Sequence, residues 1–344
     1  MKTALTRTSG AVTSDEVERM RVVENLNLAL HEVLAADPRA RLLGEDLLDP
    51  YGGAFKATRG LSTAFPAQVI TTPISESAIT GVGAGLALCG DTAIVEIMFS
   101  DFVTLAFDQI VNFAAKSVSM YGSRVPMRLI VRLPTGGGRG YGPTHSQSLQ
   151  KHFIGVPGLD VYEMSPLHDN RAVFTRMIAS QRPCVFFEDK ILYTKRMHQI
   201  DDLFTWDLTD GLARVHVDAP PDCVIIAPGG VTHRAMAAMR RLLIEQEIIC
   251  TLLVPSRLHP VDVAPLVAAV RGAKSVVVAE ESTAGGTWGA EVAHVLHREL
   301  WGVLRNPVAL AHSADSIIPT ASHLERAVLL TETTIHDTVL ESLK

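Results

Sequence analysis

Hydrophobic positions along the chain recur in two ways, as short apolar runs and at helical spacing, and the two patterns alternate. In the first half, apolar runs predict strands at 41–45, 69–71, 92–98, 127–133, 159–162 and 184–188. Apolar positions at helical spacing predict helices at 17–36, 76–90, 102–120 and 170–180. Strands that alternate with helices in this way form parallel sheets. The first half is therefore predicted to be an α/β domain.

The pattern stops after residue 190 and then resumes. Residues 190–221 lack clear periodicity and contain a double proline, so most of this stretch is predicted to be a linker that wraps the surface. Further on, the predicted strands are 223–227, 248–254, 275–279 and 308–311, and the predicted helices are 234–245, 261–270, 289–300 and 324–343. We predict an α/β fold of two doubly wound domains, divided into a disordered tail (1–18), a first domain (19–195), a linker (196–221) and a second domain (222–344).

Composition narrows the classes of function. The chain has 344 residues and a formal net charge of -6, and it contains no basic block, which argues against nucleic-acid binding. No apolar run is long enough to span a membrane, and the N-terminus lacks the apolar core of a signal peptide. The four cysteines are scattered and indicate reduced thiols in a reducing compartment. The Ser/Thr-rich start suits a disordered tail, with a short organelle transit peptide as the alternative.

Residues 71–76 place a carboxylate where an extended strand should turn into a helix. Pro73 keeps the preceding residue extended, and Ser75 is a suitable N-cap for a helix that begins near Glu76. The glycines in Gly81–Gly85 give that helix a stripe almost without side chains, where another backbone can approach. From the residues alone, Glu76 is either a first-turn acid favoured by the helix dipole or a working carboxylate at an interface.

A glycine-rich loop at 136–142 leads to His145. The loop lacks the Lys-Ser/Thr of a P-loop and the GxGxxG spacing, so neither nucleoside triphosphates nor NAD are indicated. His145 is a candidate for acid/base chemistry, and the alternative is a structural or solvated histidine. Phe102 follows a predicted strand, and it is either a stacking platform for a flat ring or a core aromatic.

Several stretches together resemble one family. They include Gly52-Gly53, the Glu76 segment, the His145 segment and, in chain order, residues 58–61, 107–110, 136–138, 157–159 and 187–193. With them, the chain after residue 20 resembles the β subunits of thiamine-diphosphate-dependent 2-oxo acid dehydrogenases, such as the pyruvate, branched-chain and acetoin enzymes. The resemblance implies a pyrimidine-binding thiamine-diphosphate domain followed by a transketolase C-terminal-like domain.

The resemblance also implies a partner chain. In this family thiamine diphosphate lies between the subunits of an α2β2 heterotetramer, where the α subunit binds Mg²⁺ and the diphosphate and the β subunit holds the aminopyrimidine. The present sequence lacks the Gly-Asp-Gly … Asn pattern that carries the metal in α chains, since its Gly90-Asp91 is followed by Thr. We therefore expect no magnesium site on this chain and no activity without an α subunit. The expected location is cytoplasmic, of the bacterial type, with the mitochondrial matrix as the alternative.

The family's functional residues map onto four positions. Glu76 matches the glutamate that hydrogen-bonds pyrimidine N1′, a bond that favours the imino tautomer of the cofactor. An apolar interface would strengthen that bond and raise the pKa of the carboxyl. Phe102 matches the aromatic that stacks on the pyrimidine, and Ile74 is expected to contact it as well. His145 matches the loop histidine that assists proton transfer around the substrate.

The substrate and the acyl acceptor each have more than one candidate. The leading hypothesis is decarboxylation of a small 2-oxo acid and transfer of its acyl group to the lipoyl arm of a transacylase. One alternative transfers a two-carbon unit from a ketose phosphate to the thiol of an acyl carrier protein, and another is a noncatalytic scaffold subunit. Arg139 and Tyr141, in the variable part of the loop, either recognise a substrate carboxylate or phosphate, or are an exposed charge and a packing aromatic. The retention of Glu76, Phe102 and His145 argues against a scaffold.

A monovalent-cation site is present in some members of this family. The matching positions are Leu129, Ile178, Ser180 and Arg182. Ser180 stands where an aspartate is often found, so the sequence departs from the family's pattern at this site.

Overall fold

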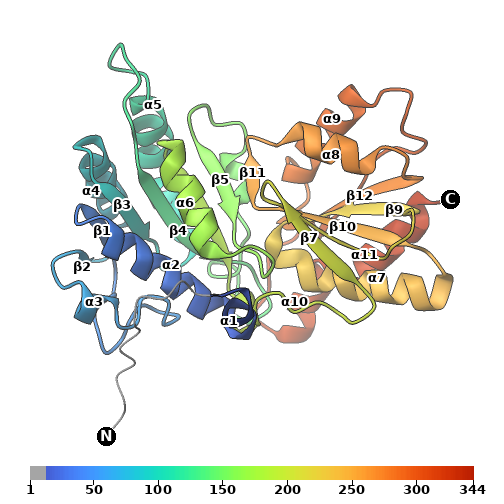
Figure 1. The fold of residues 1–344 in the computed structure, drawn as a ribbon, viewed down its shortest axis with the longest axis horizontal. Coiled ribbons are helices and arrows are strands. Elements are labelled where there is room, and N and C mark those ends of the chain that lie inside the picture. Colours follow the sequence, from blue (N-terminus) through green and yellow to red (C-terminus); the bar gives the residue numbers. More distant parts are fainter. Residues whose placement is uncertain (1–12) are drawn as a thin grey trace, which may run out of the picture.

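The structure is a computed structural model that describes residues 13–344, and the part of the expected disordered tail at 1–12 lies outside the described residues. Two α/β domains lie side by side, each built around one sheet (Figure 1). The predicted fold class, two doubly wound α/β domains, is confirmed.

The first sheet has the strand order β11-β5-β6-β4-β3-β1-β2, and all of its strands are parallel except β11. Its strands are β1 (Ala40–Gly44), β2 (Val69–Thr71), β3 (Thr92–Glu96), β4 (Leu129–Thr135), β5 (Asp160–Glu163), β6 (Cys184–Asp189) and β11 (Arg257–His259). The helices of one face, α2 (Val22–Ala36) and α6 (Asn170–Ser180), bury one hydrophobic cluster, and α4 (Glu76–Leu88) covers the other face.

Glycine lets α4 lie close to the sheet. A Cβ added at Gly83 would be 2.5 Å from Cγ2 of Val95 on β3, so even alanine would push the helix outward. Gly85, on the same helix, has no atom within 4 Å of such a Cβ. The glycine run therefore has two sides, one packed on the sheet and one open.

The second sheet has the order β13-β12-β9-β10-β8-β7, and its first four strands are parallel. Its strands are β7 (Thr205–Thr209), β8 (Leu212–His216), β9 (Cys223–Ile226), β10 (Cys250–Pro255), β12 (Ser275–Thr283) and β13 (Ala309–Ser313). Its helices are α7 (Thr232–Gln246), α8 (Val263–Val270), α9 (Trp288–Glu299), α10 (Ser322–Val328) and α11 (Glu332–Ser342). Helices α7 and α11 pack together on one face, and α8 packs beside α9 (Figure 1). Short helical turns complete the chain at α3 (Leu61–Ala64), η3 (Gln150–Phe153), η4 (Leu192–Thr194) and η5 (Gly229–Val231).

The N-terminal part differs from the prediction. A separate helix, α1 (Ser14–Arg19), occupies the end of the expected disordered tail, and Thr13 and Glu16 form its capping box. The helix predicted at 17–36 breaks at Met20, which is extended, and α2 starts anew because Glu24 accepts the N–H of Arg21 at 2.7 Å. Two capped helices therefore replace the single predicted helix and the described end of the expected tail.

The expected linker at 196–221 is also different, because it contains a β-hairpin. Strands β7 and β8 pair with each other, and β8 then adds to β10 of the second sheet. The turn is Asp210-Gly211, with φ angles of 51° and 82°. A two-residue Asp-Gly turn between alternating residues is a strong hairpin signal, and the prediction of a linker overlooked it.

Two long predicted helices are broken. Residues 102–120 form a 3₁₀ segment, η1 (Ser100–Ala106), a π segment, η2 (Gln109–Ala114), and a short α5 (Ala115–Ser117). Residues 324–343 divide into α10 and α11, because Leu329 is extended and Thr331 caps a new helix at the N–H of Thr334. Helical periodicity identified these segments but not their internal breaks.

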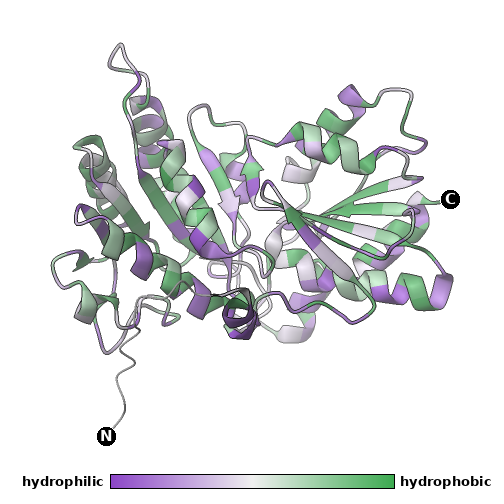
Figure 2. Cartoon of the chain, in the orientation of Figure 1, coloured by the Kyte–Doolittle hydropathy of each residue, from purple (hydrophilic) through white to green (hydrophobic). Residues whose placement is uncertain are grey.

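The two domains share buried surface. One hydrophobic cluster contains Leu133 and Phe187 from the first sheet together with Leu253 and Trp288 from the second domain. Figure 2 shows hydrophobic strands in both sheets. Across residues 13–344, no helix is both long enough and apolar enough to cross a membrane.

Candidate active site

The carboxyl ends of five strands meet at one edge of the first sheet. Gly44 at the end of β1 pairs with Thr71 of β2 and with Glu96 of β3. Further along the same edge, Thr135 at the end of β4 pairs with Asp189 of β6. Ligands of open parallel sheets bind outside the carboxyl ends of the strands, so this edge is the candidate site.

Glu76 begins α4 directly after this edge. Its residue is 7% exposed, and within the described chain no hydrogen bond reaches its carboxylate. Glu45, which follows β1, is also buried, and burial together with the nearby charge of Glu76 raises the pKa of the Glu45 carboxyl. A buried carboxylate without a donor can accept a hydrogen bond from a ligand. The sequence prediction did not include Glu45, although an acid directly after a buried strand could have identified it.

Phe102 and His145 meet at this edge. Their ring centroids are 5.2 Å apart and the rings are nearly perpendicular, at 89°. Phe99 completes a triangle of rings with these two, since its centroid is 4.8 Å from the imidazole of His145 and 6.3 Å from Phe102. Tyr141 and Phe55 pack edge-on against Phe99 at 6.0 and 5.6 Å. The prediction did not single out Phe99 as a site residue, yet this ring joins the loop to the strand end.

His145 is half-buried and has one ring nitrogen engaged. Thr144 Oγ1 lies 3.1 Å from Nδ1 of His145. With Nδ1 satisfied in this way, Nε2 is the nitrogen that can meet a ligand or exchange a proton with it.

The other predicted substrate and cofactor residues lie around the same cluster. Arg139 donates from Nη2 to the carbonyl of Lys190 at 2.5 Å, and its guanidinium is 5.7 Å from the ring of Phe55. Tyr141 is 43% exposed, and Ile74 is 80% exposed on the approach to α4. Tyr141 and Ile74 therefore have surface free for a ligand or a partner chain, whereas Arg139 is already engaged.

Lys190 is a buried cation that the prediction missed. Its side chain is fully buried, its Nζ has no hydrogen-bond partner, and it lies 5.6 Å above the ring of Phe99. Burial lowers the pKa of Lys190 to about 8. A cation–π contact with Phe99 compensates part of its lost hydration.

A buried ion network supports the strand ends. Arg132 on β4 pairs with Glu96 at 2.6 Å and with Glu188 at 2.7 Å, and its pKa is raised by these two carboxylates. The hydroxyl of Tyr193 donates to Glu188 at 2.6 Å. The network ties β3, β4 and β6 together beneath the site, so the strand ends are held in fixed relative positions.

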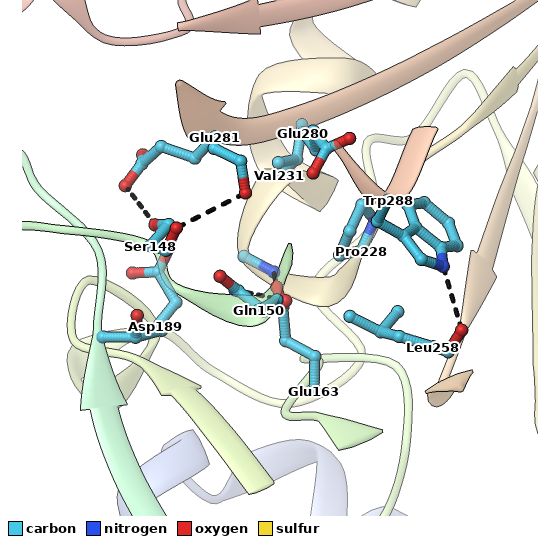
Figure 3. A pocket seen from close by; sticks show the side chains of 13 residues that line it. Ser148, Gln150, Glu163, Asp189, Pro228, Val231, Leu258, Glu280, Glu281 and Trp288 are labelled. Atoms are coloured by element: carbon cyan, nitrogen blue, oxygen red, sulfur yellow. Dashed lines mark hydrogen bonds between the residues drawn. The ribbon is translucent and has the colours of Figure 1, made fainter. Parts of the chain in front are cut away.

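A small acidic cavity of about 10 Å³ lies where the two domains meet. Its lining includes Glu163, Asp189 and Glu281 (Figure 3). Burial raises the pKa of Glu163 to about 8, and burial and the charge of Glu281 raise that of Asp189 to about 7. Arg234 pairs with Glu281 at 2.5 Å and lowers the pKa of that carboxyl. The cavity has room for about one water molecule, so it is a junction between domains and not a substrate pocket.

The four positions proposed for a monovalent cation lie at the opposite edge. Leu129 starts β4, and Ile178, Ser180 and Arg182 surround the end of α6. The hydroxyl of Ser180 donates to the carbonyl of Met177 at 2.8 Å and accepts the N–H of Arg182 at 3.2 Å. This oxygen is therefore already engaged with the backbone, and the cation site stays a prediction.

Residues 13–344 contain no group of three or more His, Cys, Asp or Glu side chains that could hold a metal ion. The groups at the edge are the carboxylates of Glu76 and Glu45, the ammonium of Lys190, the imidazole of His145 and a set of aromatic rings. Such a set can hold a flat heteroaromatic ring and exchange protons with it or with a neighbouring molecule.

Comparisons with known proteins agree with this arrangement. The model of the family "Transketolase, pyrimidine binding domain" matches residues 18–195, and that of "Transketolase, C-terminal domain" matches residues 211–335. The β subunit of the pyruvate dehydrogenase E1 component of Leifsonia xyli is 32% identical over 306 residues, which cover 89% of each chain. The mitochondrial subunit beta-1 of the same component from Arabidopsis thaliana is 32% identical over 317 residues, covering 91% of this chain and 86% of that protein.

Two further similarities extend the comparison. The mitochondrial β subunit of 2-oxoisovalerate dehydrogenase from Dictyostelium discoideum is 30% identical over 306 residues, or 88% of this chain and 82% of that protein. Among solved structures, a split-gene transketolase described as an inactive beta4 tetramer superposes with a TM-score of 0.72 at 21% identity, covering 94% of this chain and 98% of the other. At that identity the structural match shows the fold alone.

Proposed function

The chain belongs to the family of β subunits of thiamine-diphosphate-dependent 2-oxo acid dehydrogenases, and on this basis we propose that its first-sheet edge is the pyrimidine half of a shared cofactor site. The observation that carries the proposal is Glu76, a carboxylate 7% exposed that has no hydrogen-bond donor among the described residues. Phe102 and His145 lie at the same edge of the sheet.

The residues at this edge fit the aminopyrimidine of thiamine diphosphate. When bound, the cofactor supplies a nucleophilic carbon that attacks the carbonyl of a 2-oxo acid and accepts electrons during decarboxylation. Glu76 shares a proton with the pyrimidine ring nitrogen: its protonated carboxyl donates to that nitrogen, and the carboxylate accepts the N–H once the proton has moved. The buried position of Glu76 strengthens this bond. A carboxyl in this role exchanges the proton in both directions, which an amide cannot do.

Phe102 and Ile74 orient the ring. Phe102 is half-buried at the start of η1, which packs against α4, so its face can lie against a flat heterocycle. Ile74 is 80% exposed two residues before Glu76 and closes the edge of the same ring. Together they exclude water from the hydrogen bond that Glu76 makes.

His145 acts on the substrate side. Thr144 holds its Nδ1 and leaves Nε2 free to donate or accept a proton at the substrate oxygen. Tyr141 packs against Phe99, which also contacts His145, and is proposed to contact the acyl group. Arg139 is proposed to recognise a carboxylate or phosphate, for which it must give up its bond to Lys190.

The site requires a second chain. We propose an α subunit in an α2β2 heterotetramer, with Mg²⁺ and the diphosphate held by the α chain and no activity from this chain alone. Exposed apolar side chains surround the Glu76 helix and offer a surface for that partner, namely Ile70, Ile74, Val82, Leu105 and Phe107. An apolar area of this kind on a soluble chain marks a protein–protein contact.

The overall reaction proposed is decarboxylation of a small 2-oxo acid and transfer of the acyl group to the lipoyl arm of a transacylase. The named relatives act in pyruvate and 2-oxoisovalerate dehydrogenases, and they come from a bacterium and from mitochondria. A cytoplasmic location of the bacterial type remains our expectation for this chain.

The test is reconstitution. The purified chain and a co-expressed α subunit are assayed separately and together for decarboxylation of pyruvate and of branched 2-oxo acids with a redox dye as electron acceptor. We expect thiamine diphosphate and Mg²⁺ to support turnover only when both chains are present. Full activity of this chain alone would contradict the proposal that the site is shared between two chains. If an intact, cofactor-loaded α2β2 assembly turned over no 2-oxo acid, the proposed reaction would be wrong.

A further inference from the structure

The glycine-rich loop is held by carboxylates from the second domain. The N–H of Gly138 donates to Oε1 of Glu325 at 2.9 Å, and the N–H of Gly140 donates to Oε2 of the same residue at 3.0 Å. One residue earlier, the N–H of Gly137 donates to Glu281 at 2.8 Å. Gly138 and Gly140 are more than 180 residues away from Glu325 in the sequence. Only the packing of the second domain against the first brings them together.

Glu325 binds the loop through both of its carboxylate oxygens, and we call this pair of hydrogen bonds, to the N–H groups of Gly138 and Gly140, the clasp. Glu325 lies on α10 and is 2% exposed, and each of its two oxygens accepts one backbone N–H. Hydrogen bonds from backbone N–H groups to an ionised carboxylate are stronger than those between neutral groups. Glu281 differs, because Arg234 already engages its second oxygen at 2.5 Å.

The loop conformation presents its N–H groups to Glu325. Gly138 and Gly140 have φ angles of 82° and 69°, in the left-handed region that glycine adopts readily. A Cβ added at Gly142 would be 2.7 Å from Oγ1 of Thr320, and one at Gly137 would be 2.4 Å from Cδ1 of Leu329. The segment around Glu325 therefore fits the loop closely along its length.

The clasp lies between the neck of the loop and His145. At the neck, the N–H of Gly136 donates to the carbonyl of Gln147 at 3.2 Å. The segment that carries His145 is therefore fixed on both sides, by the bond from Gly140 to Glu325 before it and by the bond from Gly136 to Gln147 after it. From this geometry we infer that Glu325 is a positioning residue, which sets the place of His145 at the first-sheet edge through the backbone of the loop.

The inference rests on the role proposed for His145, and it adds that the second domain takes part in the reaction by fixing the loop. Glu325→Gln keeps the shape of the side chain but turns one acceptor into an amide that faces an N–H. Glu325→Ala removes both acceptors. Glu341, exposed near the end of α11, provides the matched control Glu341→Gln.

The first measurement is hydrogen–deuterium exchange of residues 136–147 in the full chain, read by mass spectrometry. We expect the amides of Gly138 and Gly140 to exchange about ten times faster or more in Glu325→Ala, because a hydrogen bond to a charged group of this strength protects to that extent. Glu341→Gln should exchange as the unchanged chain does. Unaltered protection in Glu325→Ala overturns the clasp.

The second measurement is a double-mutant cycle on kcat in the α2β2 assembly. We expect Glu325→Gln to lower kcat about tenfold while the KM for thiamine diphosphate stays within about twofold, since the pyrimidine residues are on other elements. In a His145→Ala background the same change should lower kcat by less than about twofold, because a residue that acts through another adds little once the other is gone. Additive effects overturn the positioning role. Normal kcat in His145→Ala itself would remove His145 from the proposed function and this role with it, whereas the exchange data would still report on the clasp.

Discussion

The imidazole of His145 stands edge-on to the ring of Phe102, with 5.2 Å between centroids and 89° between planes. The two residues come from different strand ends, so the contact closes the site between η1 and the loop.

We predict that Phe102→Ala weakens thiamine diphosphate binding by the assembled enzyme about tenfold, since stacking on an aromatic ring contributes about 1–3 kcal/mol. Isothermal titration of the cofactor into apo-enzyme measures the effect. The control is Phe65→Ala, which removes a similar edge contact, with His31 at 4.9 Å and 69°, on the opposite face of the sheet. Equal loss of affinity in both variants would show a general loss of structure.

The sequence predicted much of the framework of this site, because the family motifs are local. Glu76 lies at the start of its helix as expected, and Phe102 and His145 converge at the same sheet edge. The order of strands and helices was predictable from periodicity, since each pattern covers many residues.

Other contributors could not be predicted in this way because tertiary contacts define them. Phe99, Lys190 and Glu325 become site residues only through neighbours that are distant in sequence. The β7–β8 hairpin is a different case, since Asp210-Gly211 carried the information and was overlooked. The role of each residue toward the cofactor and substrate stays a prediction.

Glu76→Gln should lower turnover of the assembled enzyme about 100-fold or more, the range of a lost acid/base group, without dissociating it. The amide keeps the size of the side chain but cannot hold and release the proton at the pyrimidine. Carbon dioxide release gives the rate, and size-exclusion chromatography reports assembly. Glu332→Gln, at another first-turn acid, is the control on α11. Near-normal turnover with Gln at position 76 would exclude proton transfer by this carboxylate.

The glycine stripe of α4 gives a paired prediction. Gly83→Ala should destabilise the isolated chain by about 1–3 kcal/mol, because its Cβ would collide with Val95, whereas Gly85→Ala should be neutral or stabilise it by up to about 1 kcal/mol through helix propensity. If the open side of the stripe contacts the α subunit, Gly85→Ala should still weaken assembly. Urea unfolding of the chain and the Kd for the α subunit measure the two effects. Unchanged α binding by Gly85→Ala would exclude the stripe from the interface.

Glu163 gives the clearest pH prediction. Its carboxyl is buried, accepts the N–H of Gly230 at 2.9 Å and the amide of Gln150 at 2.8 Å, and has a pKa raised to about 8 by burial. The unfolded chain releases this proton near pH 4.5 and the folded chain near pH 8. The contribution of the Glu163 carboxyl to the free energy of unfolding is therefore fully present below pH 4.5. It is then lost as the pH rises to about 8.

The side chain at position 163 cannot ionise in Glu163→Gln. The free energy of unfolding of this variant, minus that of the unchanged chain, should therefore rise by up to about 1.4 kcal/mol per pH unit between pH 5 and 8. The new NH2 group faces either the N–H of Gly230 or the NH2 of Gln150, and a flip of the Gln150 amide would turn its Oε1, which has no partner in the structure, towards it. Asp189 and Glu281, which face the same cavity, titrate in both proteins and cancel to first order in the difference. Urea unfolding at pH 5.0, 6.5 and 8.0 measures that difference, with Glu341→Gln as an exposed control. Parallel stability curves for the variant and the unchanged chain would show that Glu163 is ionised in the fold throughout, and that the junction between the domains carries a full negative charge at this position.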